Sequence, residues 1–262
     1  MIRVGVFGAG GRMGSSVCRA VQEAPEMQLV AAVDPQHSGI DLDQLGVRGT
    51  GLLVASKAGA LTDAGAEVAV DFTVMDAARE NLRWCAEHGV HAVVGTTGFS
   101  DADLVELRDL FGRSDANALI APNFAIGAVL MMRFAELAAP FFESAEIIEL
   151  HHDEKVDAPS GTACATARRI AAASGDWADD PTQEVVAEGA RGGRVDGVQV
   201  HSVRLRGLVA HQEVLFGTTG QTLSIRHDSY ARSSFMPGVL LAIRRIAETP
   251  GLTLGLDAIL DV

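Results

Sequence analysis

The chain has 262 residues, which is enough for one large domain or two modest ones with a substantial core. Its formal net charge of -13 disfavours nucleic acid and anionic membranes as partners, because both are themselves negatively charged. No segment resembles a signal peptide and no apolar run reaches membrane-spanning length, so we expect a soluble, cytoplasmic protein.

The first predicted element is a short apolar strand over residues 3–7, followed by a glycine-rich turn and a helix over residues 15–24. Gly8, Gly11 and Gly14 follow a G-x-x-G-x-x-G spacing, and such glycines let the backbone approach a pyrophosphate closely. An apolar second strand ends in Asp34, where a carboxylate can accept hydrogen bonds from ribose hydroxyls. This context predicts a dinucleotide site, and a plain βαβ unit without a nucleotide is the alternative.

Strands and helices continue to alternate through the first half of the chain. Further strands are expected over residues 67–73, 90–95 and 117–122, with helices between them. Repeated βα units of this length favour a doubly wound parallel sheet, in which ligands bind beyond the carboxyl ends of the strands. We therefore expect one crevice to be lined by the three turns at residues 8–13, 95–97 and 121–124.

The pattern changes from about Phe124. A long apolar helix and a strand lead into a polar loop and a second helix, and the Gly-, Asp- and Pro-rich residues 174–197 are interpreted as an irregular excursion. Three β-like runs and a last amphipathic helix over roughly residues 234–248 follow. We predict a Rossmann-type α/β domain over residues 1–123, a second α+β domain over 124–231, and a C-terminal segment of about 232–262 that returns to the first domain.

Cys18, Cys85 and Cys164 form no C-x-x-C pair and lie in predicted helices. They are interpreted as buried small hydrophobic residues in a reducing compartment, and no metal site is predicted.

Residues 149–163 combine more potential chemistry than any other stretch. His151 and His152 can exchange protons near neutral pH, and Lys155 supplies a positive charge and a proton. Ser160, Gly161 and Thr162 open a helix, whose first N–H groups favour a carboxylate or phosphate. Singly these residues are typical of a strand end, a surface cation and ordinary N-caps. Together they indicate an active site for an anionic substrate that needs a proton.

This loop, written His-His-x-x-Lys-x-Asp-Ala-Pro-Ser-Gly-Thr-Ala, resembles the motif of the 4-hydroxy-tetrahydrodipicolinate reductases, long called dihydrodipicolinate reductases, of bacterial lysine and diaminopimelate synthesis. The resemblance extends through residues 8–14, 94–99, 121–124 and 207–217, and so over essentially the whole chain. It implies a Rossmann-type domain, a substrate-binding and tetramerisation domain, and a homotetramer. The implied reaction is the reduction of a cyclic dicarboxylic imine by NADH or NADPH, with loss of water.

Carried over to this chain, the resemblance implies that His151 donates or accepts a proton and that Lys155 donates one. The implied substrate contacts are His152, Ser160, Gly161 and Thr162. The implied cofactor contacts are Gly8, Ala9, Gly10, Gly11, Arg12, Met13, Asp34, Gly95, Thr96, Thr97, Ala121, Pro122, Asn123 and Phe124. A contribution from Arg232 is left open.

Pro35 follows Asp34, where many relatives have an arginine suited to the 2′-phosphate of NADPH. We therefore expect dual use, with NADH at least as good as NADPH, although Arg12 offers a contact to such a phosphate. Two alternatives are another two-domain dehydrogenase and a nucleotide sensor without catalysis. An acylating semialdehyde dehydrogenase needs a reactive loop cysteine, whereas Cys164 lies inside a predicted helix. A sensor would be expected to lose His151, His152 and Lys155, which this chain keeps.

Overall fold

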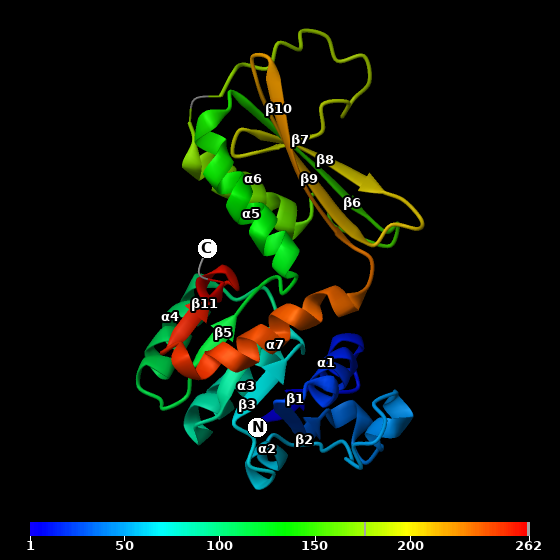
Figure 1. The fold of residues 1–262 in the computed structure, drawn as a ribbon, viewed down its shortest axis with the longest axis vertical. Coiled ribbons are helices and arrows are strands. Elements are labelled where there is room, and N and C mark those ends of the chain that lie inside the picture. The colour runs from blue at the N-terminus through cyan, green and yellow to red at the C-terminus, as the bar shows by residue number, and fades with distance from the viewer. Residues whose placement is uncertain (176, 261–262) are drawn as a thin grey trace. The chain divides into compact units, whose positions relative to one another are not determined.

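The computed structural model describes residues 1–175 and 177–260, which divide into two compact units (Figure 1). Unit 1 contains residues 1–126 and 232–260, so the segment 232–260 belongs to the same unit as the first part of the chain. Unit 2 contains the residues described between 127 and 231.

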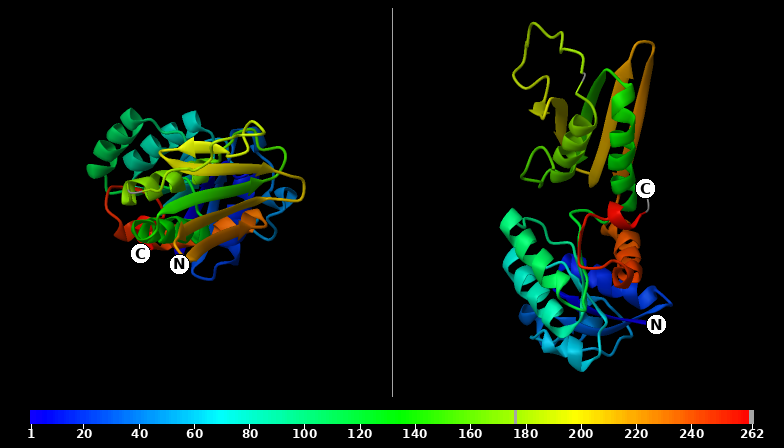
Figure 2. Two further views of the ribbon diagram at one scale, coloured as in Figure 1. Left: turned by 90° about the horizontal axis from the view of Figure 1, so that it is seen from above. Right: turned by 90° about the vertical axis from the view of Figure 1, so that its left-hand side faces the viewer.

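Unit 1 is built on a six-stranded, fully parallel sheet with the strand order β11-β5-β4-β3-β1-β2. Figure 2 shows helices on both faces of this sheet, so the strands are covered on both sides. Every residue of the central strand β3 is accordingly buried, as parallel sheets require. The strands are β1 (Ile2–Phe7), β2 (Met27–Val33), β3 (Val68–Asp71), β4 (His91–Val94), β5 (Ala118–Ile120) and β11 (Leu252–Leu254). The helices are α1 (Arg12–Glu23), α2 (Gly59–Asp63), α3 (Met75–His88), α4 (Asp101–Gly112) and α7 (Met236–Arg245). Short 3-10 helices are η1 (Pro35–His37), η2 (Leu42–Leu45), η4 (Arg232–Phe235), η5 (Ile246–Glu248) and η6 (Asp257–Ile259).

Unit 2 is a mixed five-stranded sheet with the order β10-β9-β6-β8-β7, in which β6 and β8 are parallel and the other pairs antiparallel. Two long helices lie on the same face of this sheet (Figure 1). Ile147 and Val214, which are fully buried, pair across β6 and β9. The strands are β6 (Ser144–His151), β7 (Gly193–Val195), β8 (Val198–Arg204), β9 (Ala210–Thr218) and β10 (Gln221–Ser229). The helices are α5 (Ile126–Ala138), α6 (Gly161–Ala173) and the 3-10 helix η3 (Ala139–Phe141).

The predicted fold class is confirmed: a doubly wound parallel sheet is followed by an α+β unit with a different sheet. Three local predictions were wrong. Helix α1 begins at Arg12 rather than residue 15, because Gly11 is its N-cap. The predicted excursion over residues 174–197 contains strand β7, and its residue 176 lies outside the described part. The predicted last helix is shorter, with α7 flanked by η4 and η5.

The cysteines differ in exposure. Cys18 and Cys85 are buried as predicted, and burial raises the pKa of the Cys18 thiol to about 12 and that of Cys85 further still. Cys164 is half-buried, which corrects the prediction that it is buried. Within residues 1–175 and 177–260, no helix combines the length and apolarity needed to cross a bilayer.

Candidate active site

The glycine turn after β1 has the shape of a phosphate-binding loop. Gly8 has a φ of 67°, a left-handed conformation that favours glycine. A Cβ on Gly14 would lie 2.0 Å from the carbonyl oxygen of Gly8, so a side chain there would displace backbone. Helix α1 has no side-chain cap at Gly11 and no acidic residue in its first turn. Its N-terminal N–H groups and the positive end of its dipole therefore suit a pyrophosphate.

Asp34, at the end of β2, is tied to this turn. Its carboxylate accepts the N–H of Gly10 at 3.1 Å and that of Gln36 at 3.0 Å. An ionised carboxylate accepts about four hydrogen bonds, so capacity remains for ribose hydroxyls. His37 was not named from the sequence, yet its Nδ1 lies 3.1 Å from the Asp34 carboxylate, and a Cβ on Gly10 would meet its ring at 2.2 Å.

The turns after β4 and β5 contact the residues that follow β3, Phe72 and Thr73, which were not named from the sequence. Thr96 donates its hydroxyl proton to the Thr73 carbonyl at 2.8 Å. A Cβ on Gly95 would lie 2.0 Å from the ring of Phe72, and that ring lies 5.5 Å from the ring of Phe124. The predicted cofactor residues thus gather at the carboxyl edge of the sheet. Phe72 and Thr73 lie at the same edge as the predicted cofactor residues. Their position could have been predicted from the sequence, because they directly follow a buried strand.

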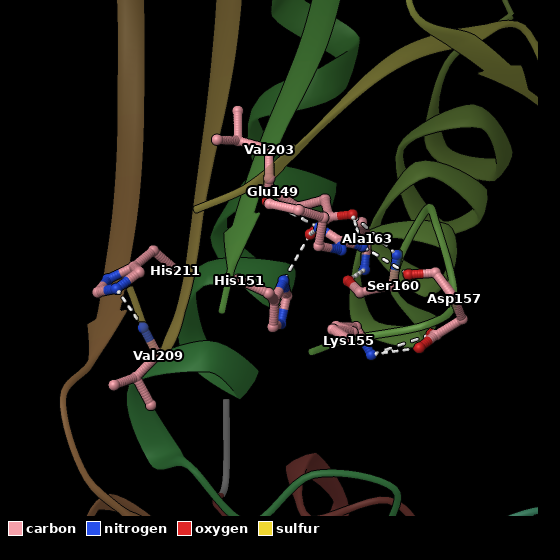
Figure 3. A network of polar contacts seen from close by, with 10 residues as sticks. Glu149, His151, Lys155, Asp157, Ser160, Ala163, Val203, Val209 and His211 are labelled. Atoms are coloured by element: carbon pink, nitrogen blue, oxygen red, sulfur yellow. Dashed lines mark hydrogen bonds and ion pairs between the residues drawn. The ribbon is translucent and has the colours of Figure 1, made fainter. Parts of the chain in front are cut away.

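In unit 2, His151 is the last residue of β6 and is held by a buried carboxylate (Figure 3). Its Nδ1 lies 2.5 Å from Oε2 of Glu149, whose side chain has no exposed surface. Residues two apart on a strand point to the same face, so the strand itself brings this acid and this imidazole together.

Arg204 on β8 binds the same carboxylate through two hydrogen bonds, Nη1 to Oε2 at 2.9 Å and Nη2 to Oε1 at 2.8 Å. The N–H of Ser160 donates to Oε1 at 3.2 Å. Burial alone raises the pKa of Glu149, but hydrogen bonds from His151, Arg204 and Ser202 outweigh it and bring the pKa to about 2. The same ion pair raises the pKa of Arg204.

Lys155 is paired with Asp157 in the loop after β6 (Figure 3). Its Nζ donates to the two carboxylate oxygens at 2.7 and 3.0 Å, and this bond lowers the pKa of Asp157. The carbonyl of Asp157 accepts from Nη2 of Arg204 at 2.6 Å. Arg204 therefore joins the lysine-bearing loop to the strand that carries His151.

Helix α6 begins directly after this loop. Ser160 is buried at its N-cap and accepts the N–H of Ala163 at 3.2 Å. Gly161 is exposed, and an added Cβ there would meet nothing within 4 Å. The carbonyl of Thr162 accepts the hydroxyl of Thr166 at 2.8 Å. The first turn of α6 thus faces open space at Gly161, where its dipole favours an anion.

The structure brings the predicted catalytic and substrate residues together in unit 2 and the predicted cofactor residues together in unit 1. His152 is exposed beside His151, and Arg232 is exposed at the start of η4 in unit 1. Sequence reasoning missed Glu149 and Arg204. Glu149 had a signal, an acid two residues before His151 in an apolar strand. No sequence pattern indicated Arg204, because its hydrogen bond to Glu149 joins residues 55 positions apart.

Comparison with known proteins identifies the family of the chain. The family model described as "Dihydrodipicolinate reductase, N-terminus" matches residues 2–124, and that described as "Dihydrodipicolinate reductase, C-terminus" matches residues 127–260. The 4-hydroxy-tetrahydrodipicolinate reductase of Nocardia farcinica is 55% identical over 100% of this chain and 99% of its own length. The one from Cutibacterium acnes is 53% identical over the whole of both chains. A solved structure, dipicolinate-bound dihydrodipicolinate reductase from Paenisporosarcina sp. TG-14, is 42% identical, covers 98% of this chain and 99% of that one, and has a TM-score of 0.88.

Proposed function

The chain belongs to the dihydrodipicolinate reductase family, and from this premise we propose how its residues reduce 4-hydroxy-tetrahydrodipicolinate. It is an oxidoreductase of lysine and diaminopimelate synthesis that uses a nicotinamide nucleotide. The observation that carries the proposal is the arrangement in unit 2: His151 on a buried carboxylate, Lys155 in the adjoining loop, and the open first turn of α6.

The residues of unit 1 fit the nicotinamide nucleotide. We propose that the turn at residues 8–13 and the start of α1 hold its pyrophosphate, because Gly14 permits the close backbone packing and no side chain caps the helix. Asp34 binds the adenosine ribose, and the turns at residues 95–97 and 121–124 line the remainder of the site. When bound, the cofactor supplies the hydride.

His151 and Lys155 supply the protons. Reduction of a conjugated imine builds carbanion character that a nearby acid must quench, and a positioned acid commonly contributes about 10²–10⁴ in rate. Lys155 carries its protons on Nζ, and Asp157 holds that ammonium in place. The imidazole of His151 is held from one side by Glu149, which leaves its other edge for the substrate.

The two carboxylates of the substrate need fixed donors. We propose that the first turn of α6, at Gly161 and Thr162, binds one carboxylate, with Ser160 completing the turn and His152 contributing from the loop. Support comes from the open space at Gly161 and from the solved dipicolinate-bound relative from Paenisporosarcina sp. TG-14, because dipicolinate is a planar dicarboxylate.

For cofactor choice, we propose that NADH serves at least as well as NADPH. Asp34 stands against the glycine turn, where its negative charge would repel a 2′-phosphate, and Pro35 offers no side-chain donor. Arg12 is exposed at the first position of α1 and offsets part of that repulsion, which favours dual use.

The homotetramer is also a proposal. In the described part of unit 2 no helix covers the sheet face opposite α5 and α6, where strand alternation places the half-buried Ile148, Leu150, Val203 and Leu215. We propose that copies of the chain assemble through this face. Light scattering should then report about four times the 27.5 kDa chain mass, and Leu215→Arg should lower it. A monomeric wild type would contradict this proposal. A cytoplasmic location remains a prediction.

The decisive test of function is a coupled assay in which the substrate is generated in situ and oxidation of NADH or NADPH is followed. Turnover that disappears in His151→Gln and Lys155→Ala supports the assignment. Nucleotide binding without turnover would instead favour the sensor.

A further inference from the structure

We infer that Glu149 is a positioning residue that fixes His151 in the tautomer with its proton on Nδ1, so that Nε2 exchanges the proton with the substrate. The inference rests on the proposed role of His151. Glu149 is buried and its partner Arg204 is half-buried, and neither is proposed to touch the substrate.

The hydrogen bonds around Glu149 use its full acceptor capacity. Oε2 receives His151 Nδ1 and Arg204 Nη1, and Oε1 receives Arg204 Nη2 and the N–H of Ser160. The side chain of Ser202 also hydrogen-bonds this carboxylate. An ionised carboxylate only accepts and has about four acceptor positions. The guanidinium of Arg204 and the N–H of Ser160 can only donate, and a guanidinium is always charged, so these bonds hold Glu149 in its ionised form. The carboxylate is therefore ionised, and His151 must place its proton on Nδ1.

Arg204 compensates the energetic cost of burying the ionised carboxylate of Glu149. A guanidinium stays protonated, so its bidentate bond neutralises Glu149 whether or not His151 carries a second proton. A buried carboxylate without such a partner would be strongly destabilising. With Arg204 present, His151 can gain and lose a proton while Glu149 supports the protonated ring, as the aspartate of a Ser-His-Asp triad does.

The surroundings leave one edge of the imidazole for chemistry. In Figure 3 the ring of His151 directs one nitrogen at Glu149 and its opposite edge away from that carboxylate. The charged groups labelled around it are Glu149 on its own strand and the Lys155–Asp157 pair in the loop. His211, also labelled, pairs with Asp228 on β10, and Arg204 binds Glu149 from β8. Nε2 is thus the nitrogen available to a substrate.

The tautomer can be measured directly in the wild-type protein. Two-bond ¹H–¹⁵N spectra of protein labelled with ¹⁵N-histidine distinguish a proton on Nδ1 from one on Nε2, and the His151→Gln variant identifies the signal among the eight histidines. We expect neutral His151 to carry its proton on Nδ1. The opposite tautomer would overturn the inference, whatever the variants show.

Glu149→Gln tests the consequence for catalysis. The amide has the same shape as the carboxylate, but one of its two oxygens is replaced by an NH₂ donor. If the NH₂ faces His151, it donates to Nδ1 and reverses the tautomer; if it faces Arg204, one hydrogen bond to Arg204 is lost. We expect kcat to fall by about 10²–10⁴, the range for loss of a correctly presented acid or base, with the Kd of NADH unchanged. Glu149→Asp, which restores a carboxylate, should recover part of kcat.

A double variant separates positioning from simple charge pairing. Glu149→Gln leaves Arg204 without its carboxylate and should lower the Tm, whereas adding Arg204→Met removes that charge and should restore the Tm while kcat stays low. Recovery of both Tm and kcat would show that Glu149 merely balances charge. Glu146→Gln is the matched control, because Glu146 also lies on β6 and binds a histidine and an arginine, His201 and Arg191, outside the proposed site. It should retain wild-type kcat.

Different results would contradict the role of His151 and the role of Glu149. Full turnover in His151→Gln would remove the proposed function itself. An inactive His151→Gln together with a fully active Glu149→Gln would remove only the positioning role of Glu149.

Discussion

Lys155 Nζ lies 2.7 and 3.0 Å from the two carboxylate oxygens of Asp157, so the lysine proposed to protonate the substrate is already paired with an anion. Asp157 is also joined through its carbonyl to Arg204. The pair therefore holds the lysine-bearing loop in place while leaving Lys155 charged.

Replacing Lys155 should separate catalysis from cofactor binding. Lys155→Ala removes a proton donor and is expected to lower kcat by about 10²–10⁴, with folding and NADH affinity nearly unchanged. Steady-state kinetics and NADH titration give both quantities. Asp157→Asn should cost less, because it weakens the hold on the ammonium but keeps the proton. Near-wild-type turnover in Lys155→Ala would rule out the assignment.

The proposed carboxylate site at the start of α6 can be probed with pyridine-2,6-dicarboxylate. We expect this planar dicarboxylate to compete with the substrate. Thr162→Val keeps the shape but removes the hydroxyl, so binding should weaken by about 10- to 150-fold, given roughly 1.5–3 kcal/mol for a hydrogen bond to a charged group. Calorimetry on both proteins measures this, with NADH affinity as the control. Equal affinity would place the carboxylate elsewhere.

Acid should weaken the fold through Glu149. Its pKa in the folded protein is about 2, below the ordinary 4.5, so the ionised carboxylate contributes stability that is fully present above pH 4.5. That contribution is lost as the pH falls from 4.5 towards 2. Chemical denaturation measures the free energy of unfolding at each pH in this range. We expect this free energy to fall less steeply with decreasing pH in Glu149→Gln than in wild type. Parallel curves would show that Glu149 does not contribute to acid sensitivity.

Two glycine-to-alanine variants test the nucleotide turn. In Gly14→Ala the new Cβ would stand 2.0 Å from the Gly8 carbonyl oxygen, so backbone must move. We expect a loss of about 1–3 kcal/mol in stability and weaker NADH binding. Gly59→Ala is the matched control, because its Cβ meets nothing within 4 Å and lies in helix α2. It should leave both quantities unchanged or raise stability slightly. Unimpaired NADH binding in Gly14→Ala would contradict the phosphate-loop assignment.

Local patterns made much of this protein predictable. Two regions could be predicted because each is short and its residue spacing determines its local structure. They are the strand, glycine turn and helix at the N-terminus, and the loop with His151 and Lys155 before α6. Strand β11 was missed because three residues show no periodicity, and it is defined by its pairing with β5. Arg204 could not be foreseen, because its bond to Glu149 depends on β6 pairing with β8 across a long excursion. His37 is a similar case: η1 turns it back onto Gly10, which no spacing reveals.

The cofactor preference depends on the residues that follow β2. Asp34 keeps its carboxylate against the glycine turn, and Pro35 has neither charge nor side-chain donor. Pro35→Arg should therefore move the ratio of kcat/KM towards NADPH, because a guanidinium can bind the 2′-phosphate through paired hydrogen bonds. The measurement is kcat/KM for both cofactors on both proteins, and Pro35→Gln, which has the bulk of a polar side chain without charge, is the control. That control should leave the ratio near its wild-type value. A wild type that already selects NADPH strongly would show that Arg12 outweighs Asp34 and would overturn this reading of the pocket.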